Sequence, residues 1–62
     1  MTVPYSNMPS KELLQRARMN LRANRYQNVA RALRILHARF PTLNNTDRIQ
    51  LKNLANRASK MY

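Results

Sequence analysis

Residues 26–41 read YQNVARALRILHARFP, and this stretch carries the clearest helical pattern in the chain. Its apolar residues recur at the i, i+3, i+4, i+7 spacing of a single helix face. We assign that face to Tyr26, Val29, Ala30, Leu33, Leu36 or His37, and Phe40. Pro41 cannot continue a helix and disfavours helical geometry at the residue before it. The stretch therefore predicts an amphipathic helix over about residues 26–39.

The segment before this stretch predicts another helix, over about residues 10–23. Its apolar stripe consists of Leu13, Leu14, Ala17 and Leu21. Ser10 could cap the helix with its side-chain oxygen, and Glu12 lies in the first turn, where the helix dipole favours a negative charge. Asn24 is the expected end, because asparagine tolerates the left-handed conformation that often terminates helices. Neither glycine nor proline separates the two helices, so one long rod through Asn24 is the alternative.

A third helix is expected over about residues 46–60, after the turn-forming sequence Pro41-Thr42-Leu43-Asn44-Asn45. Asn45 or Thr46 would cap it, and Asp47 would lie in its first turn. Its apolar residues are Ile49, Leu51, Leu54, Ala55, Ala58 and Met61. The remaining segment, residues 1–9, contains two prolines and has no helical period, so we expect an extended arm there.

These segments predict an all-α fold, either a small three-helix bundle or a helical hairpin with a packing helix, formed by residues 10–62. A chain of 62 residues buries only about 60% of its unfolded surface. It has no cysteine for disulfides, so helix packing or self-association must stabilise it, and we expect a homodimer. Met19, Ala32 and Ile35 fall outside the assigned stripes and are candidates for a dimer seam or a protein-binding patch.

The charge of the chain indicates an acidic partner. Twelve lysines and arginines face only two acids, Glu12 and Asp47, which gives a net charge of +10. Such a field attracts polyanions and accelerates their encounter. The candidate residues for binding nucleic acid or an acidic protein are Lys11, Arg18, Arg22, Arg25, Arg31, Arg34, Arg48, Lys52 and Arg57. Amides that could add contacts to bases or phosphates include Gln15, Asn20, Gln27, Asn28, Asn53 and Asn56.

The leading functional prediction is a helical nucleic-acid-binding protein, a regulator that acts on DNA in preference to RNA. The alternative is an inhibitor or adaptor that covers an acidic or nucleic-acid-binding surface of a larger protein. Short, basic, cysteine-free chains of that style are common among viral and mobile-element proteins, an analogy of style alone. Charge placement distinguishes the two classes, because an exposed apolar patch ringed by arginine suits a protein partner.

A helix-turn-helix over residues 15–34 is a weaker interpretation. Its register places Arg18, Arg22 and Asn24 where that motif needs apolar residues, and Ala23 stands where glycine is usual. A variant would use the third helix as the reader, with Asp47, Arg48, Gln50 and Asn53 near its exposed beginning.

Other classes of function find little support in the sequence. Both acids are explained as first-turn charges, and there is neither a cysteine nucleophile nor a glycine loop, so we expect no enzyme, cofactor, metal or small-molecule substrate. His37, at the edge of an apolar stripe, is expected to be a packed or boundary histidine. The sequence offers no apolar run of about eighteen residues and no secretory pattern, which predicts no membrane association and a cytoplasmic location.

Overall fold

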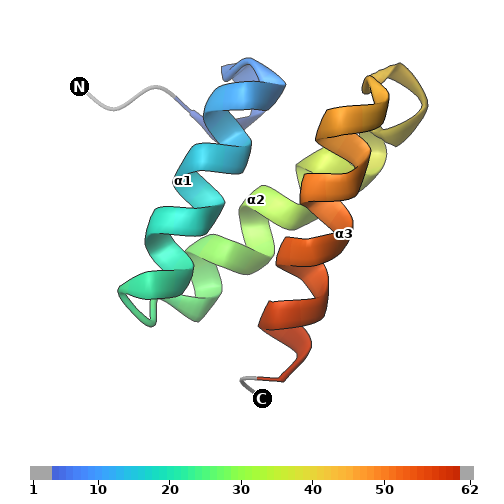
Figure 1. Ribbon diagram of the computed structural model, residues 1–62. Helices are drawn as coiled ribbons and strands as arrows, with labels where there is room; N and C mark the ends of the chain where they lie inside the picture. The colour runs from blue at the N-terminus through green and yellow to red at the C-terminus, as the bar shows by residue number, and fades with distance from the viewer. Residues whose placement is uncertain (1–3, 61–62) are drawn as a thin grey trace.

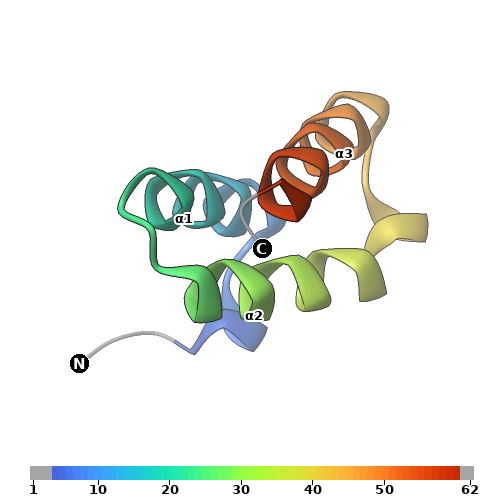
Figure 2. The ribbon, with the colours of Figure 1, turned by 90° about the horizontal axis from the view of Figure 1, so that it is seen from below.

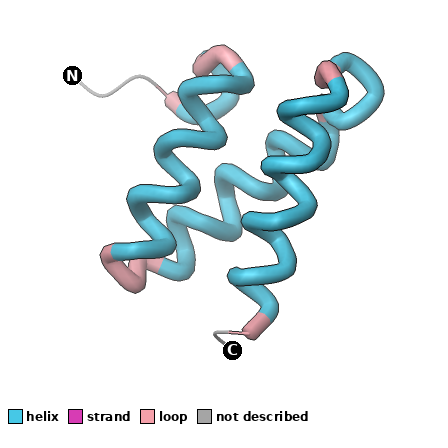
Figure 3. The backbone as a smooth tube through the Cα atoms, in the orientation of Figure 1, coloured by secondary structure: helices cyan, strands magenta, loops and turns pink. Residues whose placement is uncertain are grey.

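A computed structural model describes residues 4–60 of the chain. It contains the helices α1 (Ser10–Arg22), α2 (Tyr26–Ala38) and α3 (Asn45–Ser59), and the short 3-10 helices η1 (Tyr5–Asn7) and η2 (Phe40–Thr42) (Figure 1). Within this part of the chain there is no strand, and short loops join the helices (Figure 3). The all-α prediction is confirmed, and each of the three long helices begins and ends within one residue of the expected position.

The helices form two layers. Helices α1 and α3 lie beside one another, and α2 crosses behind both of them (Figure 1). Helix η1 packs against α2 on the side away from α1 and α3 (Figure 2). The buried core lies between the layers and includes Leu13, Leu14, Val29, Leu36 and Leu51. This arrangement leaves α1 and α3 with a shared outer face.

The turn between α1 and α2 depends on Asn24. Its φ angle is 60°, the left-handed region, which confirms it as the end of the first helix. The Arg25 N–H donates to the Asn20 carbonyl at 2.9 Å, and the Asn24 N–H donates to the Leu21 carbonyl at 3.2 Å. This pair of bonds is a Schellman motif, which satisfies the last carbonyl groups of α1. The alternative of one long rod is therefore wrong.

The buried face of α2 is rotated from the one that the sequence indicated. Ala32 is fully buried and Ile35 packs against the core, whereas Tyr26, Ala30 and His37 are exposed. The reason is that α2 packs against α1, α3 and η1 together, so its buried surface is wider and centred elsewhere than a single stripe. Ala32 is thus not free to form a dimer seam, whereas Ile35 is only half-buried.

Of the apolar residues expected to be buried in α1 and α3, most are buried and one is exposed. The stripe of α1 is confirmed, because all four of its residues are buried. In α3, Leu51, Leu54 and Ala58 are buried as expected, but Ile49 is exposed. Met61 lies outside the described residues.

Residues 4–9 of the expected arm are folded rather than extended, and residues 1–3 lie outside the described residues. The folded residues form η1 and bring Met8 into the core, where this side chain is 5% exposed. The Tyr5 hydroxyl accepts a hydrogen bond from Asn20 Nδ2 at 3.0 Å, and Arg39 donates from its guanidinium to the carbonyls of Ser6 and Met8. These polar bonds hold the segment against α1 and the end of α2.

The N-terminal caps of α1 and α3 differ from the expected ones. Pro9, not Ser10, precedes α1, and no side chain caps that helix. Asn44 caps α3, one residue earlier than expected, and its Oδ1 accepts from the Asp47 N–H at 2.8 Å. Asn44, Asn45 and Thr46 are consecutive residues that can each cap a helix, so the sequence did not decide which of them caps α3.

Replacing Arg39 with alanine should destabilise the fold by about 2 kcal/mol, because charge-assisted hydrogen bonds to two carbonyls are lost. Chemical denaturation followed by circular dichroism would measure the change. Arg16→Ala is the control, since Arg16 is exposed and should shift stability by less than about 0.5 kcal/mol. Equal losses in the two variants would contradict this role of Arg39.

Candidate nucleic-acid interface

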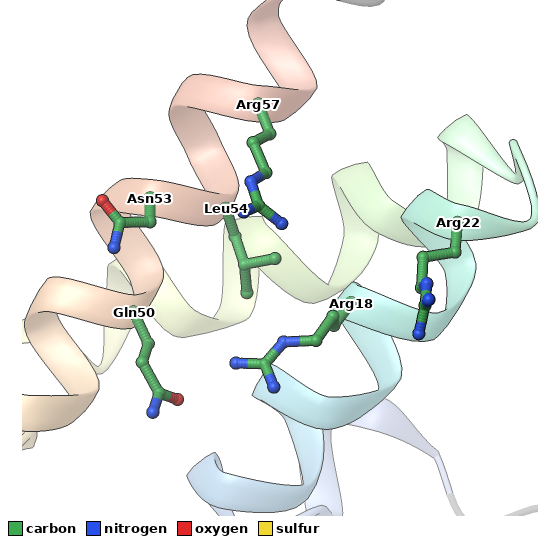
Figure 4. Close-up of a pocket in the computed structure, with 6 residues that line it drawn as sticks. All are labelled: Arg18, Arg22, Gln50, Asn53, Leu54 and Arg57. Atoms are coloured by element: carbon green, nitrogen blue, oxygen red, sulfur yellow. The ribbon is translucent and has the colours of Figure 1, made fainter.

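A groove runs between α1 and α3 on their outer face. One section, of about 410 Å³, is lined by Arg18 and Arg22 of α1 and by Gln50, Asn53, Leu54 and Arg57 of α3. Figure 4 shows α2 behind these residues. The groove therefore has two helices as its walls and the third helix beneath it.

The helical repeat places the basic side chains at this groove. Arg18 and Arg22 follow Leu14 at intervals of four residues, so they continue its row along α1, beside the buried stripe. The Arg18 guanidinium points toward α3, whereas Arg57 reaches from α3 toward α1 (Figure 4). Leu54 lies between them and is 3% exposed. The result is a cationic groove over an apolar base.

The groove continues toward the start of both helices. A second section, of about 420 Å³, is lined by Lys11, Leu14, Gln15, Arg18, Thr46, Asp47 and Gln50. It shares Arg18 and Gln50 with the first section. Four of the predicted binding residues, Lys11, Arg18, Arg22 and Arg57, thus lie along one continuous groove.

None of these cations is paired with an acid, although Asp47 lines the second section of the groove. Glu12 is exposed and Asp47 is 8% exposed, and neither forms an ion pair with a lysine or arginine in residues 4–60. Like charges held close together on a surface repel one another and attract anions. The groove is accordingly a surface on which positive charge is concentrated.

Arg48 and Lys52, two other predicted binding residues, lie beside the Phe40 ring and do not line the groove. Arg48 Nε donates to the Phe40 carbonyl and its Nη2 to the Pro41 carbonyl, each at 3.2 Å. The Arg48 guanidinium lies 5.2 Å from the centre of the Phe40 ring, and Lys52 Nζ lies 5.9 Å from it. Arg48 therefore ties η2 to α3, a structural role that the sequence did not indicate. Asp47 is buried as well. Helix α3 therefore does not present Asp47, Arg48, Gln50 and Asn53 together as a surface for reading DNA bases.

The other predicted residues lie away from the groove. Arg31 and Arg34 line a hollow between η1 and α2, and Arg25 lines hollows at the α1–α2 turn. Of the amides, Asn20 is buried and bonded to Tyr5, and the Asn53 amide points away from the groove (Figure 4). The predicted set is thus divided among several surfaces.

Comparisons with protein-family models, with curated proteins and with solved structures find no match to this chain. Within residues 4–60, no group of three or more histidines, cysteines and acids is placed to hold a metal ion. Across the same residues, none of the helices combines the length and the apolar character that crossing a membrane requires. The physical character of the groove is therefore the basis for a functional proposal.

The crowding of cations in the groove predicts that Arg18→Gln raises stability at low salt. Relief of an exposed like-charge interaction of about 0.5 kcal/mol corresponds to a rise of about 2–4 °C in the unfolding midpoint. Thermal unfolding followed by circular dichroism would test this. The rise should disappear near 1 M salt, where the screening length is about 3 Å, and it should be smaller for Arg16→Gln. A midpoint that falls at low salt would contradict the prediction.

Proposed function

We propose that the chain binds nucleic acid through the α1–α3 groove, with duplex DNA preferred. The observation that supports this most is the presence of Arg18, Arg22 and Arg57, from two helices, in one groove without an acid paired to them. Arginine binds phosphate oxygens through two parallel N–H donors, a geometry that lysine does not provide.

The length of the groove suits a phosphate backbone. From Lys11 to Arg22, α1 rises roughly 16 Å, the axial length of about five phosphates along one DNA strand. Gln15 and Gln50 lie within the same groove, where their amides can bond to phosphate or sugar oxygens. The walls of the groove thus combine four cations with neutral donors along one line, with Asp47 as the acid among them.

The groove favours nucleic acid over an acidic protein partner. Protein-binding surfaces are enriched in aromatic residues, and their hot spots in tryptophan and tyrosine as well as arginine. The apolar residues that line the groove, Leu14 and Leu54, are only 2% and 3% exposed, so they offer little area to a partner protein. Met19, Tyr26 and Ile49 are the large hydrophobic side chains that are exposed in residues 4–60, and none of them lines the groove. An inhibitor of a larger protein is therefore the less favoured function.

Titration of the chain with a blunt DNA duplex across a salt series tests the proposal. If all four groove cations contact phosphates, the logarithm of the binding constant should fall with the logarithm of salt with a slope of about −3.6. Arg18→Gln combined with Arg22→Gln should weaken binding about a hundredfold at low salt and reduce that slope by about 2.

The matched control is Arg16→Gln combined with Arg25→Gln, which removes the same charge outside the groove. It should weaken binding by less than about fivefold, through the long-range field alone. Equal losses in the two double variants, or affinity that barely responds to salt, would contradict binding in the groove. Capture of an acidic protein in place of DNA would support the inhibitor instead.

A further inference from the structure

A second hollow, of about 640 Å³, lies between η1 and α2. Its walls include Pro4, Tyr5, Asn28, Arg31, Arg34 and Ile35. Its volume falls within the range of about 300–1,000 Å³ that small-molecule sites occupy. Its walls come from η1 and α2, whereas those of the groove come from α1 and α3. Figure 2 shows these two pairs of elements in opposite layers. The two sites have no lining residue in common.

The hollow is preformed because both of its walls are held in place. On α2, Asn28, Arg31 and Ile35 follow one another at helical spacing and share a face. Across from them, the hydrogen bond from Asn20 positions the Tyr5 hydroxyl, and Arg39 holds the carbonyl of Ser6. Tyr5 is half-buried and also packs against the core, so the part of its side chain that lines the hollow is ordered.

The chemistry of the hollow differs from that of the groove. It offers an aromatic ring with apolar neighbours, one side-chain amide and two guanidinium groups, and no acid lines it. Aromatic rings bind unpaired bases by stacking, amides bond to base edges, and arginines bind the phosphates of the same strand. A base inside a duplex is already stacked on its neighbours and cannot offer its face.

We infer that the hollow between η1 and α2 binds an unpaired nucleotide of a single-stranded segment. The base stacks on Tyr5 beside Ile35, Asn28 bonds to the base edge, and Arg31 and Arg34 bind the adjacent phosphates. This inference rests on the proposed nucleic-acid-binding function and adds a second contact to it. One molecule can then hold duplex and single-stranded segments on different faces.

The test uses two probes of equal length with the full chain: the blunt duplex and a single strand containing 2-aminopurine, an adenine analogue whose fluorescence falls when it stacks. The unmodified chain should bind both probes and lower the emission of the single strand. Arg31→Gln combined with Arg34→Gln should weaken single-strand binding at least tenfold and duplex binding less than about threefold. Arg18→Gln combined with Arg22→Gln is the matched control with the same charge, and it should show the opposite pattern.

Tyr5→Leu should abolish the fall in emission while the arginines still bind the strand. Because this variant also loses the bond to Asn20, its helicity is compared with that of the unmodified chain. If Tyr5→Leu does not fold, the Arg31 and Arg34 variant tests the inference instead. Both arginines are exposed, so their replacement should leave the fold intact.

Each outcome separates the two proposals. Duplex binding without single-strand binding, or single-strand binding with unchanged emission, overturns the inference and leaves the groove function standing. The inference is also overturned if both arginine pairs weaken single-strand binding equally. Single-strand binding alone supports the hollow and overturns the groove, and binding of neither probe overturns both.

Discussion

The left-handed turn at Asn24 is the constraint on which the rest of the structure depends. The chain has no glycine, so an asparagine must supply the positive φ angle that closes the Schellman motif. Because the chain turns there, α2 folds back beneath α1 and leads to α3 on the other side. If α1 continued through this point, Arg18 and Arg22 would lie on an isolated rod, and there would be no groove.

Polar bonds complete a core that is small for an independent domain. Arg39 and Asn20 hold the N-terminal segment, and Arg48 holds the turn before α3. Such bonds from side chains to carbonyls or a hydroxyl replace the disulfides or metal ions on which many small domains rely. Some of the basic residues therefore stabilise the fold, and the total charge overstates the number that are available to a partner.

The fold also gives similar arginines different neighbours. In the groove, Arg18, Arg22 and Arg57 lie with glutamines over a buried leucine. In the rear hollow, Arg31 and Arg34 lie beside an aromatic ring and an isoleucine. We propose distinct ligands for the two faces because their neutral lining residues differ, although both faces are cationic.

The sequence alone determined the local structure: the extent of the three helices, the buried stripe of α1 and the end of that helix at Asn24. These features follow from helical periodicity and from the conformational preferences of single residues. Only the tertiary structure decided the buried face of α2, the burial of Asn20, the structural role of Arg48 and the groove between α1 and α3. Each of these features depends on which residues distant in the sequence lie together. Helical periodicity identifies the faces of a single helix, but it does not show which other helix packs against each face.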